Sequence, residues 1–440
     1  MTTVEQRIAA APSPAPAPPR TSGRDTGIDL VRALCVAAVV ILHALMVGVT
    51  VTEAGPVFAN ASEGSWWITP LSWSLQVMPL FFVIGGFAGW TAHRRARAHG
   101  GTAASFVAGR LQRLLVPALA VISVVGCALI ALAVAGVPAD LLHIAGYRYG
   151  QPLWFLGVFL LCQVLLPALA AAHERAPLRT IGALALTAAA VDALRSSTGV
   201  EGLGFLNLAF VWLALQQLGF FLADGRIDAL GRRTRVMTAI GAVALLAFGM
   251  TAGVYSPDLI AHINPPTTAL LFVGLAHTML LSLFRSRLSE WSRRPRLAWF
   301  QRFVNKRAMT IYLWHMPVLL AMAGGAAVFA ITSQSALPEP SSVEWWLTRP
   351  LWLATVLAIT ALIALPLAAL ESRRTPPAGS TRRLAAAAFS GLVAIVLLLV
   401  VGTNPGTALA AVLLILLALR LARGEVTSRS TPDDAARTRG

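Results

Sequence analysis

The sequence has few charged residues and very little cysteine. Charged side chains make up 12% of the 440 residues, well below the about 25% of soluble domains. Because 57% of the residues are hydrophobic and the mean hydropathy is +0.71, a soluble globular protein is excluded. The three cysteines, Cys35, Cys127 and Cys162, lie in apolar segments and form no CxxC pair. A disulfide framework and a zinc site are therefore excluded, and the sequence predicts no metal centre.

Both ends of the chain lack long apolar stretches. Residues 1–26 are rich in alanine and proline, so we expect a disordered tail and no cleavable signal peptide. Residues 424–440 are polar and predict a second disordered tail. The segment between them is organised differently, as a membrane domain at 27–372 and an additional transmembrane hairpin at 373–423.

Twelve apolar segments of about 20 residues predict an all-α, polytopic transmembrane helical bundle. Ten of them belong to the membrane domain and the last two to the hairpin. The predicted spans are 28–50, 70–92, 114–136, 152–171, 178–195, 205–223, 236–255, 266–284, 308–331, 351–370, 384–401 and 406–421.

The formal net charge of +16 does not indicate a nucleic-acid partner, because the basic residues are spread over short loops between the spans. If the twelve spans alternate in direction, all but three of the 35 Lys and Arg residues lie on one side; the exceptions are Arg148, Arg195 and Arg349. The positive-inside rule then predicts that both termini are cytoplasmic.

The first predicted span carries three polar residues, Asp29, Arg32 and His43. Charges inside a span are costly and usually face an interior cavity. Arg32 and His43 are separated by eleven positions, which places them within about 20° of each other on a helix and about 16 Å apart along it. Asp29 can pair with Arg32 one turn away. An imidazole at His43 can accept a proton from a hydroxyl near neutral pH, although a hydrogen bond between helices would also explain it.

Two further groups are candidate site residues. Arg110 and Arg113 project to one side of a helix, where they can bind phosphate groups or anchor the chain among lipid head groups. Tyr312 and His315 share a face of the ninth span and suit either a helix contact or a cavity. Trp154 is a possible cavity residue, although tryptophan is also common at membrane interfaces.

Four sequence pieces, in this order and at these membrane depths, resemble the acyltransferase-3 family of integral-membrane O-acyltransferases. The resemblance extends over about residues 25–370. The pieces are Asp29-Leu-Val-Arg32 followed by His43 (an Arg-x10-His pattern), PLFFVIGGFAGW at 79–90, Arg110-x-x-Arg113, and PLWFL at 152–156 together with IYLWHMP at 311–317.

Two positions depart from the family pattern. Gly85-Gly86-Phe87 stands where the family usually has Ser-Gly-Phe, and Ala44 follows His43 where a second histidine is common. These differences prevent assignment to a subfamily, but they do not remove His43 as the catalytic candidate. Glycines within a span permit close helix packing or a backbone break, and we expect packing here.

The resemblance implies an enzyme that takes an acyl group from cytoplasmic acyl-CoA, with acetyl-CoA favoured as donor. The acceptor would be a hydroxyl of a sugar, a glycan, or an envelope or secreted metabolite. Arg110 and Arg113 would bind the CoA phosphates, and His43 would act as general base or transient acyl carrier. Arg32, positioned by Asp29, would attract the donor or stabilise oxyanion charge. The Ala- and Arg-rich composition suggests the plasma membrane of a bacterium.

A transporter of an acylated lipid or glycan is the alternative, because twelve spans with interior charges also suit a carrier. A catalytically inactive scaffold is a third possibility. The arginine pair and the Arg-x10-His pattern favour the enzyme, and the sequence shows no convincing internal repeat of the kind found in carriers. The sequence specifies neither the acyl group nor the acceptor, and it is compatible with direct transfer and with an acyl-enzyme.

Overall fold

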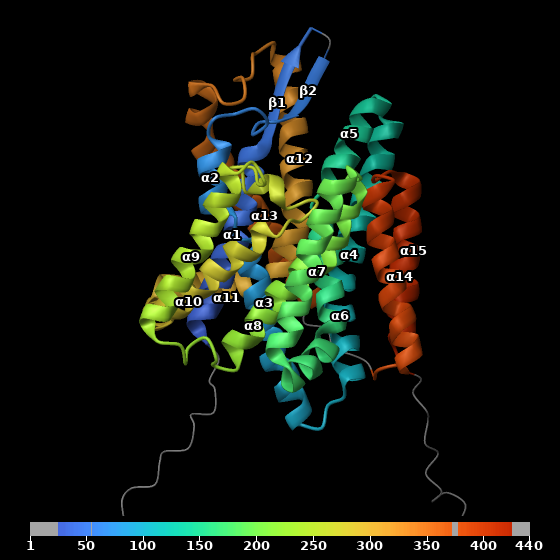
Figure 1. Cartoon of the computed structure of the whole chain (residues 1–440). Helices are drawn as coiled ribbons and strands as arrows, with labels where there is room; N and C mark the ends of the chain where they lie inside the picture. The colour runs from blue at the N-terminus through green and yellow to red at the C-terminus, as the bar shows by residue number, and fades with distance from the viewer. Residues whose placement is uncertain (1–24, 54, 372–376, 425–440) are drawn as a thin grey trace, which may run out of the picture.

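The chain folds into a bundle of helices with one small sheet (Figure 1). The computed structural model describes residues 25–53, 55–371 and 377–424, so the predicted tails lie outside the described residues except for Asp25, Thr26 and Gly424. Within these described residues, eleven helical segments are long and apolar enough to cross a membrane, and the twelfth predicted span corresponds to a shorter apolar helix, α15. The predicted all-α polytopic bundle is therefore confirmed, as expected where lipid leaves backbone groups no external partners.

The elements follow the chain in a simple order. The two 3-10 turns are η1 (Glu201–Leu206) and η2 (Ile260–His262). The helices are α1 (Thr26–Met46), α2 (Ile68–Leu75), α3 (Met78–Ala98), α4 (Ala103–Val134), α5 (Ala139–Gly150), α6 (Leu153–Arg175), α7 (Pro177–Thr198), α8 (Asn207–Ala223), α9 (Arg232–Thr251), α10 (Ala269–Ser292), α11 (Pro295–Lys306), α12 (Ala308–Ser333), α13 (Val343–Glu371), α14 (Thr381–Val400) and α15 (Pro405–Leu421).

The first predicted span, 28–50, extends four residues beyond the C-terminal end of the observed helix. Helix α1 stops at Met46, and the next residues form β1 (Val47–Thr52), which pairs antiparallel with β2 (Gly55–Asn60). In the segment VGVTVT every residue except Gly48 is β-branched, which favours a strand over a helix. The loop expected after this span is therefore partly a β-hairpin, which projects from one end of the bundle (Figure 1).

Two other segments expected to be loops are helical. The loop before the fourth span contains α5, and the basic segment 285–307 contains the end of α10 and all of α11. Pro295 stands in the first turn of α11, where backbone N–H groups have no acceptor within the helix, so the N–H that proline lacks costs no hydrogen bond. Hydropathy did not reveal α11 because the helix carries polar and charged residues along much of its surface.

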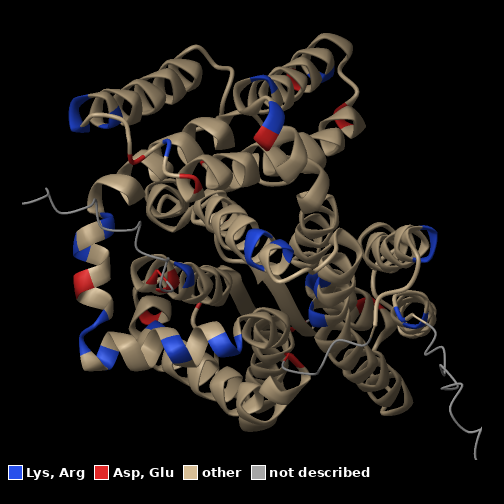
Figure 2. Ribbon diagram, turned by 90° about the horizontal axis from the view of Figure 1, so that it is seen from below, with Lys and Arg blue, Asp and Glu red and all other residues tan. Residues whose placement is uncertain are grey.

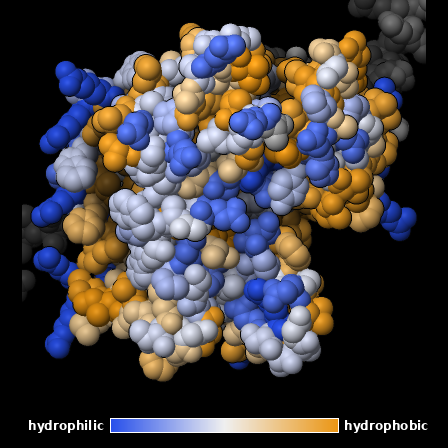
Figure 3. All heavy atoms as spheres, turned by 90° about the horizontal axis from the view of Figure 1, so that it is seen from above, coloured by the Kyte–Doolittle hydropathy of each residue, from blue (hydrophilic) through white to orange (hydrophobic). Residues whose placement is uncertain are grey.

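The two ends of the described chain, Asp25 and Gly424, lie at the same end of the bundle (Figure 1). This arrangement agrees with an even number of crossings, while the side of the membrane stays a prediction from the charge distribution. Viewed from this end, basic positions occur around the centre of the bundle as well as at its rim (Figure 2). At the opposite end, hydrophilic side chains gather at the centre and also along one edge, while hydrophobic ones occupy much of the rest of the rim (Figure 3).

Helices α3 and α8 cross closely through two glycines, which confirms close packing for the second-span glycine Gly86. A Cβ added to Gly86 would lie 2.1 Å from the carbonyl oxygen of Gln216, and one added to Gly219 would lie 2.1 Å from that of Val83. Both obstacles are backbone atoms, which cannot rotate away. The crossing is therefore possible only without side chains at these two positions.

We expect Gly86→Ala to destabilise the fold by about 1–3 kcal/mol, because the added methyl group must push two packed helices apart. The measurement is the thermal unfolding midpoint of the purified protein in detergent. Gly182→Ala is the matched control, since a Cβ there meets nothing within 4 Å and alanine favours the helix interior. Equal midpoints for the two variants would contradict this account of the crossing.

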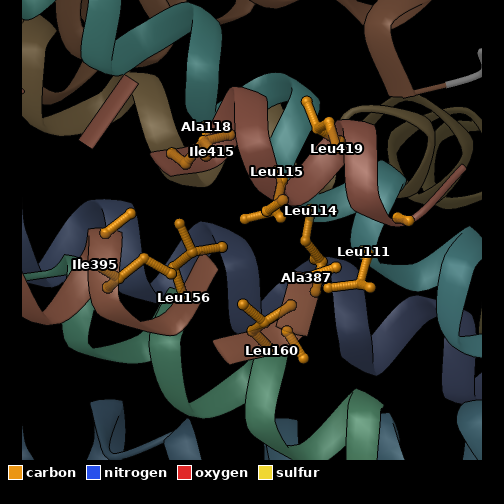
Figure 4. Close-up of a cluster of buried hydrophobic side chains, with 14 of the residues drawn as sticks. Leu111, Leu114, Leu115, Ala118, Leu156, Leu160, Ala387, Ile395, Ile415 and Leu419 are labelled. Carbon is orange, nitrogen blue, oxygen red and sulfur yellow. The ribbon is translucent and has the colours of Figure 1, made fainter. Parts of the chain in front are cut away.

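The C-terminal hairpin, α14 and α15, packs against the bundle rather than standing apart from it. Helix α15 contacts α4, and α14 contacts α6. Leu111 and Leu115 of α4 belong to the same buried cluster as Ala387 of α14 and Leu419 of α15 (Figure 4). This part of α4 also carries the two arginines singled out from the sequence, so the hairpin supports the segment that presents them.

Candidate active site

Helix α1 holds the first group of predicted residues on one face. The carboxylate of Asp25 accepts a hydrogen bond from the Ile28 N–H over 3.0 Å and caps the helix. One turn later, Nη2 of Arg32 lies 3.2 Å from the Asp29 carboxylate, so the pairing expected from the three-residue spacing is present. Arg32 is only partly exposed, which restricts the directions its guanidinium can take.

Helix α11 fixes this pair with a residue that the sequence did not single out. The amide oxygen of Asn305 accepts a hydrogen bond from Nε of Arg32 over 2.8 Å. The amide nitrogen of Asn305 donates to the backbone oxygen of Asp29 over 2.7 Å. One side chain therefore holds both members of the pair, which pre-organises the guanidinium.

Arg32 opens onto a cavity of about 400 Å³ between α1, α3, α4, α6, α11, α12 and α13. Its polar wall brings together residues that are far apart in the sequence. The structure thus places Arg32 beside the predicted pair Arg110 and Arg113, and it adds residues that the sequence did not identify. The polar lining consists of Arg32, Arg110, Arg113, Asn305, Lys306 and Glu371.

The charge of this wall favours an anionic ligand, because four basic side chains face a single carboxylate. That carboxylate, Glu371, is already engaged: its Oε1 accepts hydrogen bonds from the N–H of Thr310 over 2.8 Å and from its hydroxyl over 2.5 Å. The guanidinium of Arg110 lies over the ring of Phe106, 4.8 Å from its centroid. This contact positions Arg110, while Arg113 is exposed at the edge of the cavity.

The rest of the cavity is apolar and aromatic. Phe81, Phe155 and Phe159 form one wall; the ring centroids of Phe81 and Phe155 are 5.2 Å apart, and those of Phe155 and Phe159 are 5.4 Å apart. Along α1 the lining continues from Arg32 to Val40, a rise of about 12 Å. The cavity therefore joins a basic region to an apolar passage that follows α1 inward.

His43 lies one helical turn beyond the lining residue Val39. Its Nδ1 donates to the Val39 carbonyl oxygen over 2.8 Å. Because a carbonyl can only accept, the proton of the neutral ring sits on Nδ1 and the lone pair on Nε2. The ring of His315 from α12 lies against it, with centroids 5.0 Å apart.

The three possible cavity residues differ in their positions. Tyr312 lines the cavity, and its hydroxyl donates to the Pro152 carbonyl. His315 does not line the cavity but contacts His43. Trp154 packs elsewhere, stacked on Trp212 with centroids 5.4 Å apart. Of the three, Trp154 has the packing of a helix-contact residue.

A family model described as an acyltransferase domain matches residues 25–371, from the cap of α1 to the last residue of α13. The chain belongs to the acyltransferase-3 family. No curated protein and no solved structure matches the chain. The matched region contains every element of the cavity described above, and the hairpin α14–α15 follows it.

In this membrane acyltransferase the site combines three features that acyl transfer uses. A basic wall can hold an anionic donor, an apolar passage can accept an uncharged arm, and an imidazole with an available lone pair can take a proton. Among the described residues there is no group of three or more His, Cys, Asp or Glu side chains suited to holding a metal ion.

Three polar residues of this candidate site were not found from the sequence: Asn305, Lys306 and Glu371. Asn305 and Lys306 lie in the segment 285–307, which was interpreted as a basic loop. The amphipathic pattern of residues 295–306 was the signal that could have predicted a helix there and identified both residues. Glu371 directly follows the tenth predicted span, 351–370, between its apolar residues and the Ser-Arg-Arg segment after it. The charge of Glu371 at the end of an apolar span was the sequence signal that could have identified it as a site residue.

Proposed function

We propose that this acyltransferase moves an acyl group from a cytoplasmic acyl-CoA, with acetyl-CoA as the favoured donor, to a hydroxyl of a sugar, glycan or other envelope or secreted metabolite. The observation that carries the proposal is the cavity itself. Three arginines and a lysine surround one part of it, and its apolar part extends along α1 to within one turn of His43. A donor with phosphates at one end and a thioester arm at the other fits this distribution of charge.

The donor phosphates are held by Arg110 and Arg113, assisted by Lys306. Guanidinium groups bind phosphate oxygens through paired, charge-assisted hydrogen bonds. The pantetheine arm then lies along the aromatic wall, which excludes water from the thioester. Arg32 is fixed by Asp29 and Asn305 and lies between the two regions, where it stabilises negative charge on the donor or on the tetrahedral intermediate.

His43 acts as general base. Its Nε2 takes the proton from the acceptor hydroxyl while the hydroxyl oxygen attacks the thioester carbonyl. The C–S bond breaks as the intermediate collapses, the acyl group stays on the acceptor oxygen, and the proton returns to the departing thiolate to give CoA. The Nδ1 hydrogen bond to Val39 supports this role because it holds the tautomer with a lone pair on Nε2.

The acceptor approaches from the other end of the bundle. His43 lies near the end of α1 that leads into β1, and the centre of that face is hydrophilic (Figure 3). With the orientation predicted from the charge distribution, this face is outside the cytoplasm. The proposal thus places donor and acceptor on opposite sides of a bacterial plasma membrane, with the chemistry between them.

The test is release of CoA thiol from acetyl-CoA by the full-length protein in nanodiscs, with and without a panel of free monosaccharides as acceptor probes. Sugar-dependent release, together with transfer of radiolabelled acetyl to the sugar, is the expected result. Longer acyl-CoAs are assayed in the same way. Absence of both donor binding and release for all of them would overturn the proposal and direct the search to a transported glycan or lipid.

A further inference from the structure

His43 has an imidazole neighbour that the proposed mechanism has not used. The ring of His315 lies against it at 62°, with centroids 5.0 Å apart, and His315 is completely buried. Each histidine donates its Nδ1–H to a backbone carbonyl one turn earlier on its own helix, that of Val39 or that of Tyr312. Both of these carbonyl residues line the cavity. The two rings therefore lie together, directly beyond its inner end.

The hydrogen bonds leave both rings in the same protonation pattern. With the proton on Nδ1, each neutral ring has a lone pair on Nε2. Nε2 of His315 is buried and has no hydrogen-bond partner among the described residues. A buried acceptor without a donor is destabilising, and a catalytic role is one of the physical reasons for which such a group is retained.

The separation of the rings suits one shared proton. A ring nitrogen lies about 1.1 Å from its centroid, and an N–H···N bond spans about 2.9 Å, so two hydrogen-bonded imidazoles have centroids about 5 Å apart. The observed 5.0 Å allows such a bond, while among the described residues no hydrogen bond joins the two neutral rings, as expected when each Nε2 carries a lone pair. Protonation of either ring would supply the missing donor for the other.

The surroundings offer little other support for a charge at this point. Among the described residues, no ion pair involves His43 or His315. An imidazolium formed at His43 inside the membrane would thus lack a carboxylate partner, and unpaired buried charge is strongly unfavourable. The nearby ring of Tyr312, 5.9 Å from that of His315, carries no charge to offset it.

We infer that His43 and His315 form a proton-sharing pair, an inference that rests on the proposed function. When the acceptor O–H bond breaks, the proton binds Nε2 of His43. As the acceptor oxygen bonds the thioester carbon, this N–H turns away from that oxygen, and Nε2 of His315 accepts a hydrogen bond from it. The positive charge is then spread over two rings until the thiolate takes the proton as CoA leaves. His315 is in this sense a positioning residue for the charge, and it acts through His43.

The experiment compares His315→Leu, which removes the acceptor, with His315→Gln, whose amide oxygen can still accept a hydrogen bond. His277→Leu is the matched control, another histidine within a span, on α10. We expect His315→Leu to lower kcat for CoA release by about 10²-fold or more, with KM for acetyl-CoA nearly unchanged. His315→Gln should retain more activity than His315→Leu, and His277→Leu should resemble wild type.

A measurement on the wild-type protein is independent of turnover and of variant folding. With ¹⁵N-histidine labelling, the ring nitrogens of His43 and His315 are expected to respond together when the pair binds its first proton. Equal activities of wild type and His315→Leu, or a response of His43 alone, would overturn the inference. If wild type transfers acetyl and His43→Ala does not, while His315→Leu is unimpaired, only the pair is wrong; if wild type itself neither binds nor cleaves acyl-CoA, the proposed function fails instead.

Discussion

Replacing His43 with alanine is expected to lower kcat for acyl transfer by about 10³-fold or more. General-base catalysis contributes about 10²–10⁴-fold, and in the described site no carboxylate lies against this imidazole to take over the proton. KM for acyl-CoA should change little, because His43 lies one turn beyond the cavity lining and away from the basic wall. The measurement is CoA release and sugar acylation by protein in nanodiscs.

The control for this variant is His277→Ala, which removes a histidine from the middle of another span. Both variants are compared for expression and thermal midpoint, so that lost activity is separated from lost fold. A His43→Ala protein that folds and transfers acyl groups at the wild-type rate would remove His43 from the mechanism. The cavity and its basic wall would then need a different base.

The double variant Arg110→Ala, Arg113→Ala is expected to raise KM for acyl-CoA by about 10²-fold. Each charge-assisted hydrogen bond to an ionised group contributes about 1.5–3 kcal/mol, and the exposure of Arg113 places its share at the lower end through screening. Direct binding of acyl-CoA should weaken by the same factor, while kcat at saturating donor should fall much less. Added salt should weaken wild-type binding more than that of the variant.

The matched control is Arg232→Ala, Arg233→Ala, which removes two adjacent exposed arginines at the start of α9, outside the cavity lining. The control keeps the same change in net charge, so it measures the effect of overall electrostatic attraction alone. Equal KM values for the two double variants would mean that Arg110 and Arg113 anchor the helix among lipid head groups. Lipid head-group anchoring is the alternative role that the position of both arginines at the end of a span suggests.

The local arrangement of α1 could be predicted from the sequence. Helical periodicity places Arg32 and His43 on one face and Asp29 within reach of Arg32, and the structure has the Asp29–Arg32 ion pair at 3.2 Å. The end of the helix could not be predicted from hydropathy. Residues 47–50 continue the apolar stretch, although their β-branched residues favour the strand that they form by pairing with β2.

The composition of the cavity lay beyond sequence reasoning. Asn305 hydrogen-bonds Arg32 across 273 positions of the chain, and no periodicity within either helix encodes that contact. Trp154 and His315 illustrate the same limit. Both were possible cavity residues from their place in a span, yet one stacks on Trp212 and the other contacts His43.

The sequence by itself determined the class of this protein: a membrane-embedded helical bundle whose first span carries polar residues on one face. The physical reason is that lipid requires long apolar segments with internally bonded backbones, so hydropathy and the 3.6-residue period record both features locally. Only the tertiary structure decided which side chains meet around Arg32 and His43. These side-chain contacts depend on how the helices cross. A crossing such as that of α3 and α8 at Gly86 and Gly219 is set by steric contacts between segments more than a hundred residues apart.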